Sequence, residues 1–141
     1  MKKLALGICA LVACFVFASC SHDSSAALDK IKDLKKKAEK VKTADELLDV
    51  TEDFLEASID FYKGNPSKSQ IEKYQERSYD FSKAISEAKS DFKKSEKKKM
   101  EELRKDKSTH YRMIKLQREL EDAVYAGQSF GENPCMTVLR F

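Results

Sequence analysis

Residues 43–66 read TADELLDVTEDFLEASIDFYKGNP and hold the most apolar part of the chain beyond its first twenty residues. Thr43, followed three residues later by Glu46, fits a capping box that starts a helix. Gly64 is expected to supply a left-handed cap that ends the helix, and Asn-Pro follows. The stretch therefore predicts a core helix over 44–63. Its apolar residues are Ala44, Leu47, Leu48, Val50, Phe54, Leu55, Ile59, Phe61 and Tyr62.

The segment before this helix, 24–42, predicts another amphipathic helix. Its apolar residues recur at steps of three and four, which places them on one face. Ser24 or Ser25 is expected to accept the first free backbone amides. At Thr43 a second helix starts, or the first one continues. The apolar residues are Ala27, Leu28, Ile31, Leu34, Ala38 and Val41.

The segment after the turn, 67–126, predicts a long helical region with a heptad-like stripe in its first part. Asn65 can cap it with Pro66 in the first turn, or Ser67 and Gln70 form a second capping box. The short turn favours an antiparallel helix pair. In that pair Phe54, Leu55, Ile59 and Tyr62 would face Ile71, Tyr74, Phe81 and Ile85.

The stripe fades over 93–107, which is strongly charged. This run holds four acidic residues, and its apolar residues are Met100 and Leu103. The candidate function is contact with an anionic surface or an acidic partner. The alternative is a solvated helix face with mixed charges, which the i to i+4 pairing of Lys97 with Glu101 also fits. The basic residues are Lys93, Lys94, Lys97, Lys98, Lys99, Arg104, Lys105 and Lys107.

The region 67–126 is either one long helix or one that bends near Ser108-Thr109. A straight helix of this length would span about 90 Å, whereas a turn lets the last part fold back into a compact bundle. We expect helix to end at Gly127. The rest, 127–141, predicts a loose tail with a short strand over 137–141.

The first twenty residues predict an export signal. A basic start at Lys2 and Lys3 precedes an uncharged apolar stretch from Leu4 to Phe17, and small residues follow. This is the layout of a secretory signal peptide. The apolar stretch is shorter than the 18 to 20 residues, roughly, of a membrane span.

The sequence Phe17-Ala18-Ser19-Cys20 resembles the lipobox of bacterial lipoproteins, with Phe17 in place of the more usual Leu. The resemblance implies cleavage before Cys20 and attachment of diacylglycerol to its thiol. Two or three acyl chains hold a protein on a membrane without spanning it. A rival lipobox ends at Cys14, but cleavage there would leave an apolar end, whereas Cys20 is followed by polar residues. An ordinary signal peptide or an uncleaved anchor is the other alternative.

The charge balance excludes a strongly basic or acidic class of protein. The 141 residues carry 27 Lys and Arg against 24 Asp and Glu. Loss of Lys2 and Lys3 with the leader leaves a net charge of +1, which does not favour a nucleic-acid partner. Cys135 would be the only other cysteine of the mature chain, so no internal disulfide is expected. With 4 Gly and 2 Pro, the composition favours helices over sandwiches or barrels.

No residues with the spacing of a catalytic or metal site are present. His22 lies in the polar segment after Cys20, and His110 has no carboxylate or Cys at ligand spacing. We therefore expect no metal, no cofactor and no enzymatic activity. The Phe and Tyr residues of the stripe are more typical of a core than of a ligand box.

The leader with its lipobox, followed by a charged helical body, resembles the small helical lipoproteins of uncharacterised function in Bacteroidota; the motif covers twenty residues, and the body is similar only in style. We predict an all-α fold, either an elongated helical hairpin or a three-helix, coiled-coil-like bundle. The expected segments are a signal peptide over 1–19, a lipidated tether over 20–25, a helical domain over 26–126 and the tail. The expected function is a binding or structural module anchored in the cell envelope, on the outer membrane because Ser21 follows the cysteine. Alternatives are a chaperone-like hairpin for exported proteins and an immunity or exclusion lipoprotein.

Overall fold

The computed structural model describes residues 22–127, and helices joined by short turns make up this part of the chain, which confirms the all-α prediction. Five helices follow one another and no strand occurs among these residues. They are α2 (Ser24–Ala38), α3 (Ala44–Lys63), α4 (Lys68–Asp91), α5 (Lys94–Lys105) and α6 (Lys107–Gly127). The expected tail and strand lie outside the described residues.

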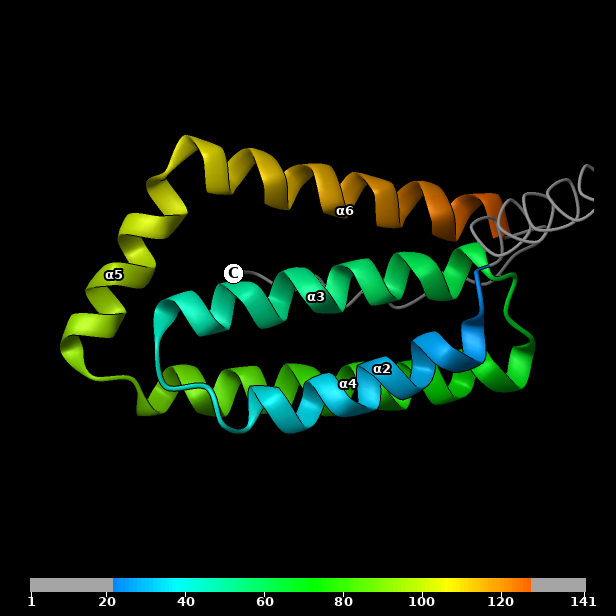
Figure 1. The fold of residues 1–141 in the computed structure, drawn as a ribbon, viewed down its shortest axis with the longest axis horizontal. Helices are drawn as coiled ribbons and strands as arrows, with labels where there is room; N and C mark the ends of the chain where they lie inside the picture. Colours follow the sequence, from blue (N-terminus) through cyan, green and yellow to red (C-terminus); the bar gives the residue numbers. More distant parts are fainter. Residues whose placement is uncertain (1–21, 128–141) are drawn as a thin grey trace, which may run out of the picture.

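The bundle is built around α3 (Figure 1). Helices α2 and α4 lie on one side of α3, and α6 lies on the other, while α5 crosses one end and joins α4 to α6. Short turns make α3 antiparallel to α2 and α4. Because α5 carries the chain across the end, α6 runs parallel to α3. The end opposite α5 collects the start of α2, the end of α3 and the start of α4.

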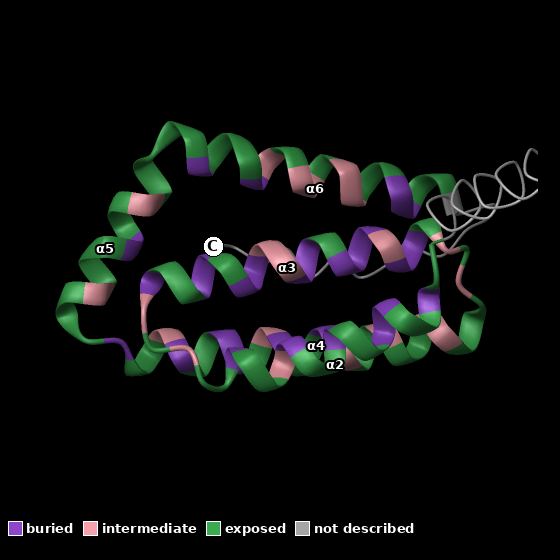
Figure 2. Ribbon diagram, viewed as in Figure 1, coloured by how far each residue is buried: buried purple, intermediate pink, exposed green. Residues whose placement is uncertain are grey.

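The core lies on two faces of α3. Toward α2 and α4, a cluster of buried residues includes Ile31, Leu34, Phe54 and Phe81. Toward α6, Leu48 and Leu55 pack against Met113. Figure 2 shows that buried positions recur along α3, whereas α5 is mostly exposed. Helix α3 is therefore the core helix that its apolar sequence predicts.

The predicted pairing of α3 with α4 is correct for part of the set. The rings of Phe54 and Phe81 stack with centroids 4.1 Å apart, and those of Tyr62 and Tyr74 meet edge to face at 5.1 Å. Leu55 instead belongs to the cluster with Met113 of α6. Helix α3 thus has partners on two sides, which a simple hairpin does not provide.

Both capping boxes of the sequence are present. Thr43 and Glu46 cap the start of α3, so a second helix starts there, and Ser67 and Gln70 cap α4. The expected cap of α2 is wrong: the carboxylate of Asp23 accepts the first amides, and Ser24 and Ser25 are already helical.

The expected left-handed cap at Gly64 is also wrong. Gly64 has a φ of −72°, which any residue adopts, and the positive φ of 55° belongs to Asn65. An asparagine tolerates this conformation better than most residues. The turn between α3 and α4 therefore forms at the expected place through the neighbouring residue.

The region 67–126 is not one continuous helix, which confirms the bend that was expected near Ser108-Thr109. The break lies at Asp106, two residues before Ser108, and a further break at Phe92 and Lys93 was not predicted. Both corners have extended backbone, with ψ of 135° at Phe92 and 120° at Asp106. These two corners divide the region into three helices, α4, α5 and α6, and let α5 and α6 pack against α3.

Candidate functional site

The proposed lipidation site lies just outside the described residues. Cys20, its rival Cys14 and Cys135 all fall there, and the described chain begins at His22, two residues after Cys20. The end of the bundle at which the chain enters is therefore the first candidate site. The basic helix α5 at the opposite end is the second.

The entering chain is held against the end of α3. The imidazole Nδ1 of His22 lies 3.1 Å from Oδ1 of Asp60. The buried hydroxyl of Ser24 donates a hydrogen bond of 2.7 Å to the carbonyl oxygen of Phe61. This carbonyl belongs to the last turn of α3, where four C=O groups lack helical partners. The start of α2 therefore completes the end of α3.

Gly64 allows this close approach. A Cβ added at Gly64 would lie 2.3 Å from Oγ of Ser24 and 2.7 Å from the backbone nitrogen of the same residue. Distances this short would force the chain apart. The glycine at the end of α3 is thus required for space beside the start of α2.

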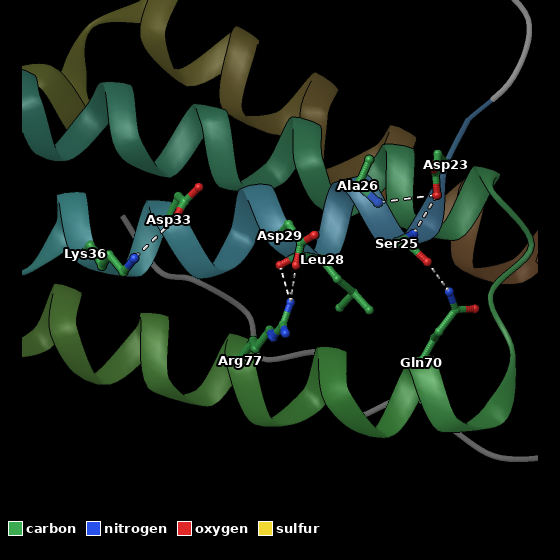
Figure 3. A network of polar contacts seen from close by, with 9 residues as sticks. All are labelled: Asp23, Ser25, Ala26, Leu28, Asp29, Asp33, Lys36, Gln70 and Arg77. Atoms are coloured by element: carbon green, nitrogen blue, oxygen red, sulfur yellow. Dashed lines mark hydrogen bonds and ion pairs between the residues drawn. The ribbon is translucent and has the colours of Figure 1, made fainter.

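Helix α4 holds the start of α2 from its other side (Figure 3). The side-chain amide of Gln70 donates to the hydroxyl of Ser25 at 3.0 Å. The guanidinium of Arg77 donates to the carbonyl oxygen of Leu28 at 2.6 Å and lies 3.6 Å from the carboxylate of Asp29. Within the expected tether over 20–25, the described residues are therefore part of the folded bundle.

The basic run of α5 is partly neutralised within the bundle. Lys99 pairs with Asp45 of α3, and Arg104 lies 2.6 Å from Glu101. Lys98 lies 3.9 Å from Glu102, and the ammonium of Lys97 donates to the carbonyl oxygen of Ser90 at 3.3 Å. The remaining predicted residues are exposed and form no ion pair with another described residue. They are Lys93, Lys94, Lys105 and Lys107.

Two carboxylates fix α5 in place. Glu96 accepts a hydrogen bond of 2.9 Å from the backbone N–H of Ala44 at the start of α3. Asp106 accepts one of 2.8 Å from the N–H of Thr109 at the start of α6, and this bond lowers the pKa of the Asp106 carboxyl. Neither role was predicted from the sequence, although an Asp three residues before Thr109 is a recognisable capping signal.

A groove of about 470 Å³ runs between α3 and α6. Its walls carry Glu52, Glu56 and Asp60 from α3, with Arg112, Lys115 and Glu119 from α6. Glu52 lies 3.2 Å from Arg112, yet its buried Oε1 has no hydrogen-bond partner. Burial raises the pKa of Glu52, and the opposing effect of Arg112 is smaller. The walls of the groove therefore carry side chains of both charges.

The acidic residues of α3 form a stripe that sequence reasoning also missed. Asp45, Asp49, Glu52, Glu56 and Asp60 recur at steps of four and three, which places them on one helix face. Three of them lie beside basic side chains: Lys99 of α5, Arg112 of α6 and His22 of the segment before α2. The spacing in the sequence predicts the acidic stripe, but it does not predict which basic side chains of other segments pack beside it.

The part of the chain between residues 22 and 127 holds no group of three or more His, Cys, Asp or Glu side chains placed to bind a metal ion. Nor is any helix in that part both long enough and apolar enough to cross a membrane.

Comparison with known proteins gives no relative. No family model matches the chain, and neither a curated protein nor a solved structure matches it.

Proposed function

We propose that the protein is a lipoprotein of the cell envelope, anchored on the outer membrane by acyl chains on Cys20. The helical bundle then acts as a binding or structural module that the anchor holds at the membrane surface. The lipobox-like sequence supports the anchor, because an apolar leader followed by small residues and a cysteine is the pattern that lipidation requires.

One structural observation carries the proposal. The folded part begins at His22, and its first residues are bound to both α3 and α4. Only Ser21 would separate the bundle from a lipidated Cys20. Such a short link leaves little freedom, so the anchor would hold the end of the bundle that contains His22 close to the membrane.

A role in binding is favoured over an enzymatic one. The groove between α3 and α6 is open and lined by paired charges. Among the described residues, His22 pairs with Asp60 and His110 is exposed on α6. Neither imidazole lies beside a nucleophile with which it forms a hydrogen bond, so general acid-base chemistry of the usual kind has no support.

The bundle supports the alternatives less well. A chaperone of the hairpin type needs a long pair of helices that protrudes from the body of the protein. Here the corners at Phe92 and Asp106 fold α5 and α6 back onto α3. An immunity or exclusion lipoprotein is compatible with the same fold, and loss of protection on deletion of the protein is its test.

The anchor is tested by metabolic labelling with an alkyne fatty acid, followed by separation of membrane and soluble fractions. Wild type should carry the label in the membrane fraction. Cys20→Ala should lose the label and leave that fraction or keep an uncleaved leader, whereas the matched control Cys14→Ala should behave as wild type. If the label is lost with Cys14→Ala and kept with Cys20→Ala, the lipid anchor is on Cys14 instead of Cys20. An unlabelled wild type would overturn the proposal.

A dedicated partner is tested by crosslinking in cells before a pull-down. If the module serves one envelope complex, wild type should enrich one protein that Cys20→Ala does not. If nothing specific is enriched although the anchor is confirmed, a role in a dedicated complex is excluded.

A further inference from the structure

The end of the bundle opposite the proposed anchor carries a distinct charge arrangement. We call this end the distal tip and define it as residues 37–46 and 91–107. It contains the end of α2, the start of α3 and all of α5 (Figure 1). Helix α3 has 20 residues and is therefore about 30 Å long. This length separates the distal tip from His22 at the other end.

The carboxylates of the distal tip are all engaged by partners in the bundle. Glu46 and Glu96 accept backbone N–H groups at the start of α3, and Asp106 does so at the start of α6. The partial positive charge of a helix N-terminus offsets a carboxylate placed there. The other acidic side chains of the tip have a lysine, arginine or serine partner.

Several lysines of the distal tip lack such partners. Their side chains are exposed and form no ion pair or hydrogen bond with another described residue. They include Lys37, Lys40, Lys93, Lys94, Lys105 and Lys107. Along α4 the pattern differs, because exposed lysines such as Lys73 and Lys83 alternate with acidic residues such as Glu76 and Asp80 that have no ion-pair partner among the described residues. Free positive charge therefore accumulates at the tip.

The spacing of these lysines favours an extended ligand. Lys93 and Lys94 lie at the start of α5 and Lys105 and Lys107 at its far end, about 18 Å apart along a helix of 12 residues. A small anion cannot contact both groups, whereas a chain of repeated anionic groups can. Lysine ammonium groups act as point charges and suit such distributed carboxylates or phosphates, where arginine would favour a single bidentate contact.

We propose that the distal tip binds an anionic polymer with carboxylate or phosphate groups, held about 30 Å from the membrane that carries the anchor. The position of this polymer rests on the proposed function, because the anchor at Cys20 sets which end faces away from the membrane. The anionic headgroups of that same membrane would lie at the other end of the bundle. The protein would thereby connect a membrane with an anionic layer in front of it.

The test uses the full mature lipoprotein in vesicles of neutral phosphatidylcholine and fluorescent poly-glutamate or polyphosphate as the probe. Wild type should bind either polymer with an affinity that falls as salt rises, because bound counterions are released and charges are screened. The tip variant replaces Lys93, Lys94, Lys105 and Lys107 by Gln and should bind at least about tenfold more weakly. The control variant removes the same charge elsewhere, at Lys30, Lys32, Lys68 and Lys73, and should change binding less than twofold.

Three outcomes would overturn the proposal. These are absence of binding by wild type, equal losses in the tip and control variants, and binding to vesicles of anionic lipid without binding to either polymer. The last result would assign the tip to a facing membrane instead. Circular dichroism checks that both variants fold. An unlabelled Cys20 would overturn the anchor and the orientation, while binding of the polymer by the tip would still be measurable in solution, so the two failures are distinguishable.

Discussion

Glu52 is a charged residue at the edge of the core that links α3 to α6 by an ion pair, and its carboxylate loses part of its solvation there. Its side chain is 23% exposed and lies 3.2 Å from Arg112 of α6. The buried Oε1, which is the oxygen that faces Arg112, accepts no hydrogen bond. The ion pair therefore does not fully replace the hydrogen bonds that this oxygen would form with water. The pKa of Glu52 is raised because the loss of solvation exceeds the attraction of Arg112.

The raised pKa makes the contribution of Glu52 to stability depend on pH. The folded state holds the proton more tightly than the unfolded chain does. The contribution of Glu52 to stability is therefore fully present below the ordinary Glu pKa of about 4.3. It is lost as pH rises through the raised pKa of Glu52 in the folded state. Glu52→Gln should remove this fall and unfold in urea with a free energy about 0.5 kcal/mol higher than wild type at pH 7, with no such gain near pH 4.

The neighbouring Glu56→Gln serves as the control, because Glu56 is exposed in the same groove and carries the same charge. This variant should show no comparable difference between the two pH values. A lower stability of Glu52→Gln than of wild type at pH 7 would mean that the ion pair with Arg112 outweighs the cost of burial.

Gly64 illustrates a residue that sequence reasoning places correctly for the wrong reason. A glycine after an apolar helix predicts a left-handed cap, and the helix does end there. The backbone of Gly64 needs no special conformation. Its missing side chain makes room for Ser24, forty residues earlier in the chain. Such a requirement comes from tertiary packing and leaves no local signal.

At the scale of elements, the corner at Phe92 decides that α5 crosses the end of the bundle. Phe92 is 5% exposed and belongs to the cluster that also contains Phe81, Ile85 and Met100. Its backbone is extended, so the helix ends where its side chain enters the core. The corner is thus stabilised by burial of an aromatic ring and contains neither Gly nor Pro.

Phe92→Ala should therefore destabilise the protein by about 3 to 5 kcal/mol, the usual cost of removing a buried aromatic ring. Urea unfolding measures the loss, and hydrogen exchange should show that α5 is the helix most affected. Tyr79→Ala is the matched control, because Tyr79 is an aromatic residue of α4 that is 68% exposed, and it should cost less than about 0.5 kcal/mol. Similar losses in both variants would mean that Phe92 does not hold the corner.

The sequence predicts some elements well and others poorly for physical reasons. The bounds of α3 follow from its apolar period and its capping box, which are both local. The corners at Phe92 and Asp106 occur in segments of good helix formers, and burial of Phe92 and docking of Glu96 on Ala44 outweigh that propensity. For the candidate site, the sequence identifies the run of basic residues in and around α5. It does not predict which of them form ion pairs with acidic residues and which do not.

At the scale of the whole molecule, the two candidate sites lie at opposite ends of the long axis. The entering chain is bound to α3 and α4 at one end, and α5 with its free lysines closes the other. An anchor on Cys20 would turn this difference between the ends into an orientation. The bundle would stand on the membrane with α5 outward.

This orientation can be tested by quenching of a fluorophore with lipids that carry nitroxide headgroups. In a Cys135→Ser background, the label is attached at Lys68→Cys, beside the anchored end, or at Ser95→Cys on α5; both native side chains are exposed. The label at position 68 should be strongly quenched in vesicles that carry the lipoprotein. The label at position 95 should be nearly unquenched, because about 30 Å of helix lies between the two ends and contact quenching does not reach so far. Equal quenching at both positions would mean that the bundle lies flat on the membrane, and then the lysines of α5 would meet the headgroups of that membrane instead of a polymer in front of it.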